Sequence, residues 1–264
     1  LFTDDVTIEN ITDQWEAFSL HGPSSADLLV AIGGEGLDQP GTHHVMNLAG
    51  EKATVYRWDV CGAKGYTLWC KVDHAPLLYQ AMLDAAGFDV NAPDPVKDPQ
   101  GAADAARKRR DSLRGRPIGW LAFNTARIEA GTPIFHVDFG ADCLTHETGL
   151  LHEVVSFTKG CYVGQEIVAR MENLGHPKRM LSGLRLEGDG LPLAGAQVFD
   201  AEDHHQVIGA VTSSAIAPMR GNAAIGFAMM KWGKHRPDTR VIVAGEGQMV
   251  PAMTTALVQD DPQG

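Results

Sequence analysis

Short apolar segments separated by turns dominate the chain from Met180 onward. Gly, Pro and Asp residues stand between consecutive segments. A series of short strands with such turns is typical of a small β-barrel or sandwich. We therefore place a domain boundary near Lys178 and expect a β-barrel domain over residues 178–264. The expected strands cover residues 181–186, 197–200, 207–211, 223–228, 240–243 and 250–257.

The part of the chain before Lys178 mixes strand-like and helix-like patterns. Alternation at residues 15–20 predicts a strand, and apolar residues at helical spacing over 24–32 predict a helix between Pro23 and Gly33. A strand, a helix, three strands and a helix in this order favour an α+β fold with helices on one face of an antiparallel sheet. The further strands are expected at 43–48, 53–59 and 66–72, and the further helices at 74–86, 101–113, 118–130 and 167–172.

Composition narrows the functional classes. A formal net charge of −11 argues against a general binder of nucleic acid or anionic membranes, because phosphate contact needs local Lys and Arg. The four cysteines show neither a CxxC pair nor zinc-ribbon spacing, which fits a reducing compartment. Neither a signal peptide nor an apolar run of about 18 residues is visible. We therefore expect a cytoplasmic protein that binds no nucleic acid and no membrane.

Residues 159–166 read Lys-Gly-Cys-Tyr-Val-Gly-Gln-Glu and are called the octapeptide below. Its two glycines make the backbone permissive and let a ligand approach closely. The charge of Lys159, two residues before Cys161, favours the reactive thiolate. A cysteine alone is more often a packed small hydrophobe. In this setting Cys161 is the first candidate for chemistry, as a nucleophile, a redox thiol or an iron ligand.

The segment Arg127-Ile128-Glu129-Ala130-Gly131 ends the expected helix over 118–130. The two oxygens of the Glu129 carboxylate suit the paired N–H donors of an amino-pyrimidine edge. A solvated glutamate paired with a neighbouring arginine would give the same pattern and contribute little. The residues alone leave both interpretations open.

Residues 135–152 are irregular and polar, and ligand-type side chains are frequent in and just after them. They lack the spacing of a helical zinc site, so a polar surface loop is the stronger interpretation and we expect no metal ligands. The side chains are those of His136, Asp138, Asp142, Cys143, His146, Glu147, His152 and Glu153.

The octapeptide resembles the signature of the YgfZ-type branch of the folate-binding, glycine-cleavage T-protein (aminomethyltransferase) superfamily. Residues 127–131 resemble the Arg-x-Glu-Ala-Gly element of the same family, residues 20–23 its earlier Gly-Pro landmark, and residues 208–213 part of its closing barrel. The resemblance implies a ferredoxin-like folate-binding domain over 1–177 and a β-barrel over 178–264. Because the sequence starts after the first part of that domain in family members, we expect the folate-binding domain to be partial.

For this branch the resemblance implies a protein that binds tetrahydrofolate and supports the assembly or repair of iron–sulfur cluster proteins. Cys161 would be the functional thiol and Lys159 its charged neighbour, and these two are the candidate catalytic residues. Glu129 would contact the pterin ring. Further folate contacts are expected from Tyr162, Gln165, Glu166 and Arg170. The alternatives are a one-carbon transferase, either an aminomethyltransferase or a demethylase, and a non-catalytic binding module.

Overall fold

The computed structural model describes residues 6–89, 91–94, 96–108, 115–188 and 190–257. The chain forms two compact units, Leu1–Ile118 and Gly119–Gly264, and each is described by itself. Within the described residues, no helix combines the length and the apolar character needed to cross a membrane.

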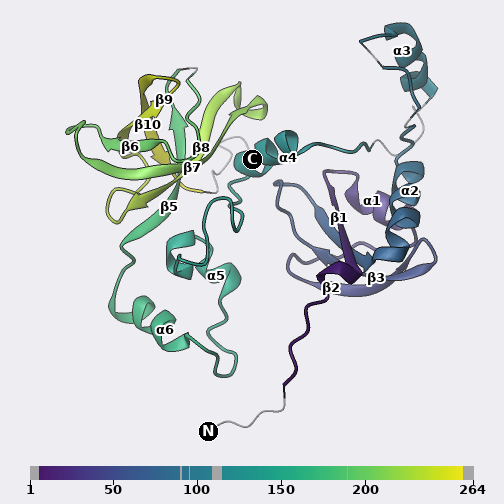
Figure 1. Ribbon diagram of the computed structural model, residues 1–264, viewed down its shortest axis with the longest axis horizontal. Helices are drawn as coiled ribbons and strands as arrows, with labels where there is room; N and C mark the ends of the chain where they lie inside the picture. The colour runs from purple at the N-terminus through teal and green to yellow at the C-terminus, as the bar shows by residue number, and fades with distance from the viewer. Residues whose placement is uncertain (1–5, 90, 95, 109–114, 189, 258–264) are drawn as a thin grey trace. The chain divides into compact units, whose positions relative to one another are not determined.

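The first unit is an antiparallel sheet with two helices packed on one face (Figure 1). Its strand order is β1-β4-β3-β2, so β2, β3 and β4 form a meander and β1 returns beside β4. The strands are β1 (Trp15–His21), β2 (His43–Leu48), β3 (Glu51–Arg57) and β4 (Gly65–Lys71). The helices are η1 (Thr12–Gln14), α1 (Ser25–Ala31), η2 (Val72–His74), α2 (Ala75–Ala85) and α3 (Pro99–Lys108).

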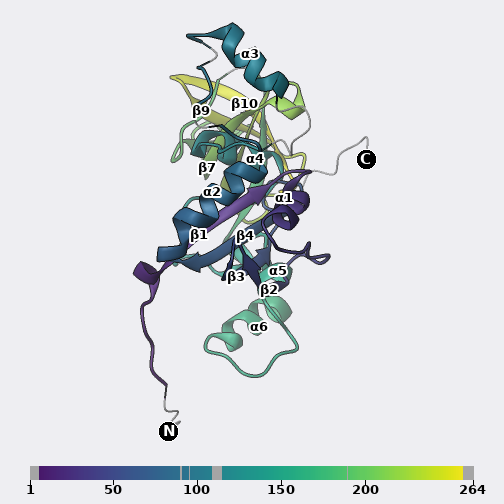
Figure 2. The same ribbon diagram turned by 90° about the vertical axis from the view of Figure 1, so that its right-hand side faces the viewer.

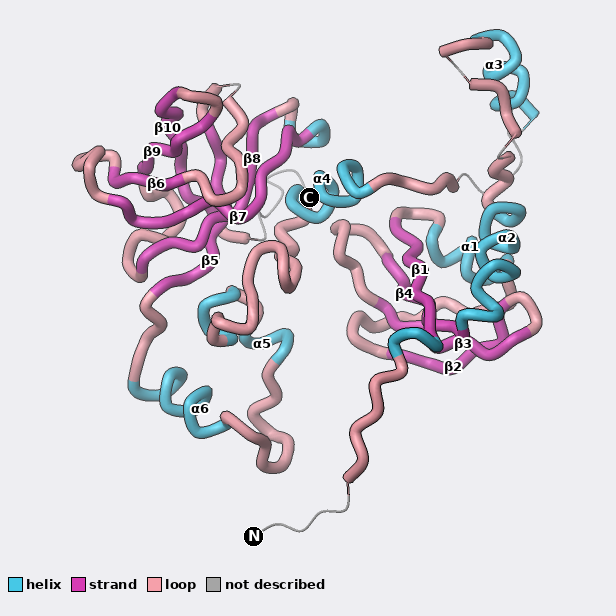
Figure 3. The backbone as a smooth tube through the Cα atoms, viewed as in Figure 1, coloured by secondary structure: helices cyan, strands magenta, loops and turns pink. Residues whose placement is uncertain are grey.

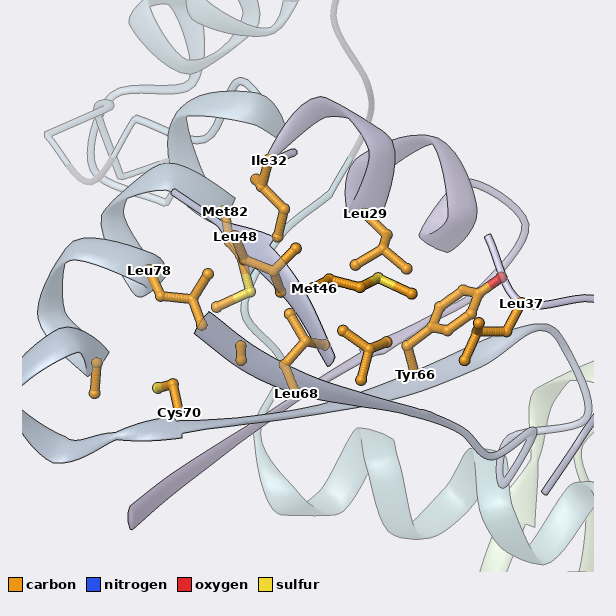
Figure 4. Packing of buried hydrophobic residues seen from close by; sticks show 13 residues of the cluster. Leu29, Ile32, Leu37, Met46, Leu48, Tyr66, Leu68, Cys70, Leu78 and Met82 are labelled. Carbon is orange, nitrogen blue, oxygen red and sulfur yellow. The ribbon is translucent and has the colours of Figure 1, made fainter. Parts of the chain in front are cut away.

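The core of this unit lies between the sheet and the helices α1 and α2. Figure 4 shows Leu29 of α1 and Leu78 of α2 in one cluster with the strand residues Leu48 and Leu68, and all four are fully buried. Alternate residues of β4 face this core, whereas Trp69 between them is 50% exposed, as the two-residue period of a strand requires.

The second unit is built around a six-stranded closed barrel with the order β10-β5-β8-β7-β6-β9 (Figure 3). The strands are β5 (Arg179–Leu186), β6 (Gln197–Asp200), β7 (Val207–Ala217), β8 (Ala223–Lys231), β9 (Arg240–Gly245) and β10 (Gln248–Thr255). The helices are α4 (Trp120–Glu129), η3 (Thr145–Thr148), α5 (Leu151–Val154), α6 (Gln165–Leu174) and η4 (Pro218–Arg220). Figure 2 shows the same elements from the side.

Two apolar clusters hold this unit together. One fills the barrel and includes Val198, Ile208 and Val243. The other joins Ile128 of α4 to Phe227 of β8 and to neighbouring side chains of the barrel. Because α4 shares this second cluster with the barrel, it belongs to the same compact unit.

The prediction of an α+β chain that ends in a small β-barrel is confirmed. The compact units divide between Ile118 and Gly119, and the division into domains 1–177 and 178–264 stays a prediction. The expected helix over 101–113 corresponds to α3, and residues 109–113 of that prediction lie outside the described residues.

Two local predictions were wrong. The strand expected at 207–211 continues to Ala217, past a bulge between Val211 and Ser213. Its polar residues looked like the end of a strand because their partners lie far away in the sequence. The segment 135–152 is not simply a polar surface loop, since it contains η3 and buries Asp138, His146 and Glu147.

Candidate functional site

The guanidinium of Arg127, near the end of α4, is fully buried and lies at the centre of a polar network. It donates from Nε to Asn124 Oδ1 at 2.9 Å and from Nη1 to the Thr132 carbonyl at 3.2 Å. It also donates from Nη1 to Asp138 Oδ2 at 2.5 Å and from Nη2 to Ser213 Oγ at 2.7 Å. Since Ser213 belongs to β7, the network attaches α4 to the barrel.

Asp138 is the anionic partner of Arg127, and its side chain is also fully buried. Besides the bond from Arg127, Oδ2 accepts the Ile134 N–H at 2.8 Å. Its Oδ1 accepts the hydroxyls of Thr212 at 2.9 Å and Ser213 at 2.5 Å. A buried ion pair is tolerated only when further hydrogen bonds satisfy its remaining lone pairs and protons, and here they do. This pairing is why Asp138 is buried, contrary to the polar surface loop expected for this segment.

Glu129 is the last residue of α4, and the short helix η4 of the barrel contacts it at two points. Its Oε1 accepts the backbone N–H of Met219 at 2.9 Å. Its backbone carbonyl accepts a bond from Arg220 Nη2 at 3.0 Å. A carboxylate offers about four acceptor positions, so the Met219 bond alone leaves capacity for an external donor. Glu129 is therefore an oriented carboxylate at the edge of the barrel.

The octapeptide forms the turn before α6 and the first two residues of that helix. Gly164 caps this helix with a φ of 90°, a conformation that favours glycine. Cys161 is exposed and forms no disulfide. Lys159 Nζ lies 4.5 Å from the centroid of the Tyr162 ring, and the Tyr162 N–H donates to Gln165 Oε1 at 3.1 Å. Lys159, Tyr162 and Gln165 thus form a local cluster beside the exposed thiol.

Glu166 and Arg170 lie four residues apart on α6, and both are exposed. Across the described residues, no hydrogen bond or ion pair is seen for either side chain, and none joins the octapeptide to Glu129. The predicted site residues are therefore found in two groups of the same compact unit, one at the end of α4 and one around the start of α6.

A second set of charged side chains, which the sequence had not singled out as a unit, anchors the segment between α4 and the barrel. Arg179, the first residue of β5, donates from Nε to Glu147 Oε2 at 3.1 Å and from Nη2 to Asp142 Oδ2 at 2.9 Å. The bond from Arg179 lowers the pKa of the Asp142 carboxyl. His146 Nε2 lies 3.5 Å from Glu172 Oε2 of α6, which is close enough for an ion pair when the imidazole is protonated.

In the part of the chain that the structure describes, His, Cys, Asp and Glu side chains form no group of three or more that could hold a metal ion. In the segment 135–152, Asp138 pairs with Arg127, and Asp142 and Glu147 pair with Arg179.

Comparisons with known proteins find similarity to glycine cleavage T-proteins and aminomethyltransferases. Residues 179–259 match the family described as the glycine cleavage T-protein C-terminal barrel domain. The chain is 26% identical over 90% of its length to an aminomethyltransferase of Caldanaerobacter subterraneus subsp. tengcongensis, of which it covers 57%. It is 28% identical over 96% of its length to an aminomethyltransferase of Chlorobium luteolum, of which it covers 62%. The chain thus spans about three fifths of the length of these relatives.

A solved structure supports the fold. The glycine cleavage system aminomethyltransferase T from Bartonella henselae superposes with a TM-score of 0.53 and 19% identity, covering 92% of this chain and 83% of that chain. At this identity the likeness concerns the fold alone. Residues 179–259 are thus similar to the barrel domain of glycine cleavage T-proteins, and the chain as a whole is similar to aminomethyltransferases at 26–28% identity.

Proposed function

We propose that the protein binds tetrahydrofolate or a derivative and supports the assembly or repair of iron–sulfur cluster proteins, as expected for the YgfZ-type branch. The oriented carboxylate of Glu129 carries the folate part of this proposal. The exposed thiol of Cys161 carries the iron–sulfur part. The two parts are tested separately.

The chemistry of Glu129 suits the pterin ring of a folate. The ring presents a 2-amino group and an adjacent ring N–H on one edge, and an ionised carboxylate accepts such paired donors in a bidentate manner. The bond from the Met219 N–H holds one oxygen of Glu129 in a defined direction. A carboxylate that is oriented before binding loses less conformational freedom when the ligand arrives.

The residues around the start of α6 suit the other end of a folate and a protein client. Folates carry glutamate carboxylates, and the guanidinium of Arg170 is exposed on α6. Cys161 is exposed, so its thiol is accessible to a cluster or to a client protein. Lys159 and Tyr162 flank this thiol in the sequence and contact each other.

Calorimetric titration with 5-formyltetrahydrofolate, an oxidation-resistant reduced folate, tests the first part. We expect binding by the wild-type protein and at least a tenfold weaker affinity for Glu129→Gln, since a charge-assisted bond is worth about 1.5–3 kcal/mol. Glu153→Gln removes an exposed carboxylate from α5 and serves as the matched control. The absence of both binding heat and a thermal shift with the wild-type protein would refute folate binding.

Complementation in cells tests the second part. In cells that lack the gene, we expect the complete gene to restore the activity of an iron–sulfur enzyme and the Cys161→Ala variant to fail. Cys61→Ala controls for the general loss of a thiol. Full restoration by Cys161→Ala at equal protein abundance would exclude a role for this thiol.

One-carbon transfer is the second candidate, because the relatives are named aminomethyltransferases. In that reaction the aminomethyl carbon of a donor passes to tetrahydrofolate, which forms methylenetetrahydrofolate, and ammonia leaves. Incubation of the full-length protein with an aminomethylated carrier and tetrahydrofolate tests it. Turnover that survives Cys161→Ala would favour transfer over the accessory role.

A further inference from the structure

We propose that η4 of the barrel is a positioning element for the folate site, acting through the backbone N–H of Met219 on the carboxylate of Glu129. This inference rests on the proposed folate binding by Glu129. It adds that the barrel, through a main-chain donor, determines how the pterin-binding carboxylate is oriented. Met219 would thus affect ligand binding without contacting the ligand.

Consecutive residues of η4 hold both the side chain and the main chain of Glu129. The Met219 N–H donates to Glu129 Oε1 at 2.9 Å, and Arg220 Nη2 donates to the Glu129 carbonyl at 3.0 Å. The last carbonyls of a helix have no partner within the helix, so the arginine satisfies a group that would otherwise need water. The Met219 bond offsets the unfavourable position of a carboxylate at the negative end of a helix.

Both sides of this contact are attached to the same strand. η4 follows directly after the end of β7 at Ala217, and the Ala217 carbonyl accepts the Asn222 N–H at 2.9 Å to close the turn. On the side of α4, Arg127 donates a hydrogen bond to Ser213 of β7. Because β7 supports both, the direction of the Glu129 carboxylate depends on the barrel.

The Met219 side chain is 87% exposed, so the position can be changed without disturbing a core. This separates the backbone donor from the side chain. Proline lacks the N–H, and its φ of about −65° suits a 3₁₀ helix. Alanine keeps the N–H and removes the side chain.

The experiment compares Met219→Pro with Met219→Ala in titrations with two probes, 5-formyltetrahydrofolate and p-aminobenzoylglutamate, which lacks the pterin ring. We expect Met219→Ala to bind like the wild-type protein. We expect Met219→Pro to bind 5-formyltetrahydrofolate about tenfold more weakly, because the Glu129 carboxylate is then no longer oriented before the ligand arrives and must be ordered on binding. Its affinity for p-aminobenzoylglutamate should stay unchanged, which a general structural defect would not predict.

Equal affinity of Met219→Pro and Met219→Ala for 5-formyltetrahydrofolate would overturn the positioning role. Failure of the wild-type protein and of Met219→Ala to bind would instead overturn the proposed folate function. Because the residue before a proline is biased away from helical angles, a thermal melt accompanies each titration. If Met219→Pro melts early, an ester bond in place of the 219 amide removes the same N–H and decides the question in the same way.

Discussion

The buried pair of Arg127 and Asp138 provides the sharpest test of the structure. In Asp138→Asn the side chain keeps its shape but loses its charge. Each oxygen of Asp138 accepts two hydrogen bonds, one oxygen from Arg127 and Ile134 and the other from Thr212 and Ser213. The amide N–H₂ of an asparagine would face two donors if it pointed to Arg127 and Ile134. If it pointed to Thr212 and Ser213, their hydroxyls would have to accept instead of donate, and the charge that compensates Arg127 would be absent in both orientations.

The expected loss follows from the burial of both side chains, which are 0% exposed. Removing one partner of a buried ion pair leaves an uncompensated charge and costs about 3–5 kcal/mol. For a unit of this size, each kcal/mol lowers the melting temperature by roughly 2–4 °C, so we expect a decrease of roughly 6–20 °C.

Hydrogen exchange of the amides in β7, measured by mass spectrometry, reports on this unit separately from the first one. Glu187→Gln, at an exposed site, removes one negative charge and is the matched control. The double variant Arg127→Met/Asp138→Leu should be less destabilised than Asp138→Asn, because apolar residues often replace a buried ion pair at little cost. A loss below about 1 kcal/mol for Asp138→Asn, or a double variant as unstable as the sum of its single variants, would refute the reasoning.

Three further predictions concern other parts of the chain. A Cβ at Gly226 would lie 2.4 Å from a backbone oxygen of β7, whereas one at Gly164 meets nothing within 4 Å. Urea titration should therefore show a much larger loss of unfolding free energy for Gly226→Ala than for Gly164→Ala, whose cost of about 1–2 kcal/mol comes from its φ of 90° alone. Equal losses would contradict the barrel packing. Iodoacetamide labelling should modify exposed Cys161 well before buried Cys70, since burial raises the pKa of the Cys70 thiol, and the reverse order would contradict the placement of the octapeptide. Because the pKa of Asp142 is lowered, its contribution to stability is present above the ordinary aspartate pKa of 3.8 and is lost as the pH falls through the lower pKa of the folded state. In an acid titration of stability, the Asp142→Asn variant should therefore lack this pH-dependent contribution.

Local patterns predicted most secondary structure because each element depends on its own residues. Alternation located β1, and Gly33 located the end of α1. The end of β7 was missed because Thr212 and Ser213 are polar, and polar residues in a strand look like a turn unless their partner is known. That partner is Asp138, which lies 74 and 75 residues earlier in the chain.

The residues of the candidate site also divide into those that the local sequence indicated and those that only the tertiary structure revealed. The octapeptide and Glu129 were selected from the sequence, because their residue types and glycines are local features. Arg127 stood beside Glu129 in the same segment, yet its role was invisible: an arginine near a helix end is usually solvated, and only its burial against Asp138 shows otherwise.

By itself the sequence determined the kinds and order of the elements, the short strands of the last part and the position of an exposed cysteine between two glycines. The tertiary structure decided that the strands close into a barrel, that Arg127 and Asp138 are buried together and that Met219 orients Glu129. These contacts join residues 86 and 90 positions apart, such as Arg127 with Ser213 and Glu129 with Met219. Local propensity carries no information about such pairs, because they form only when packing brings distant segments to the same place.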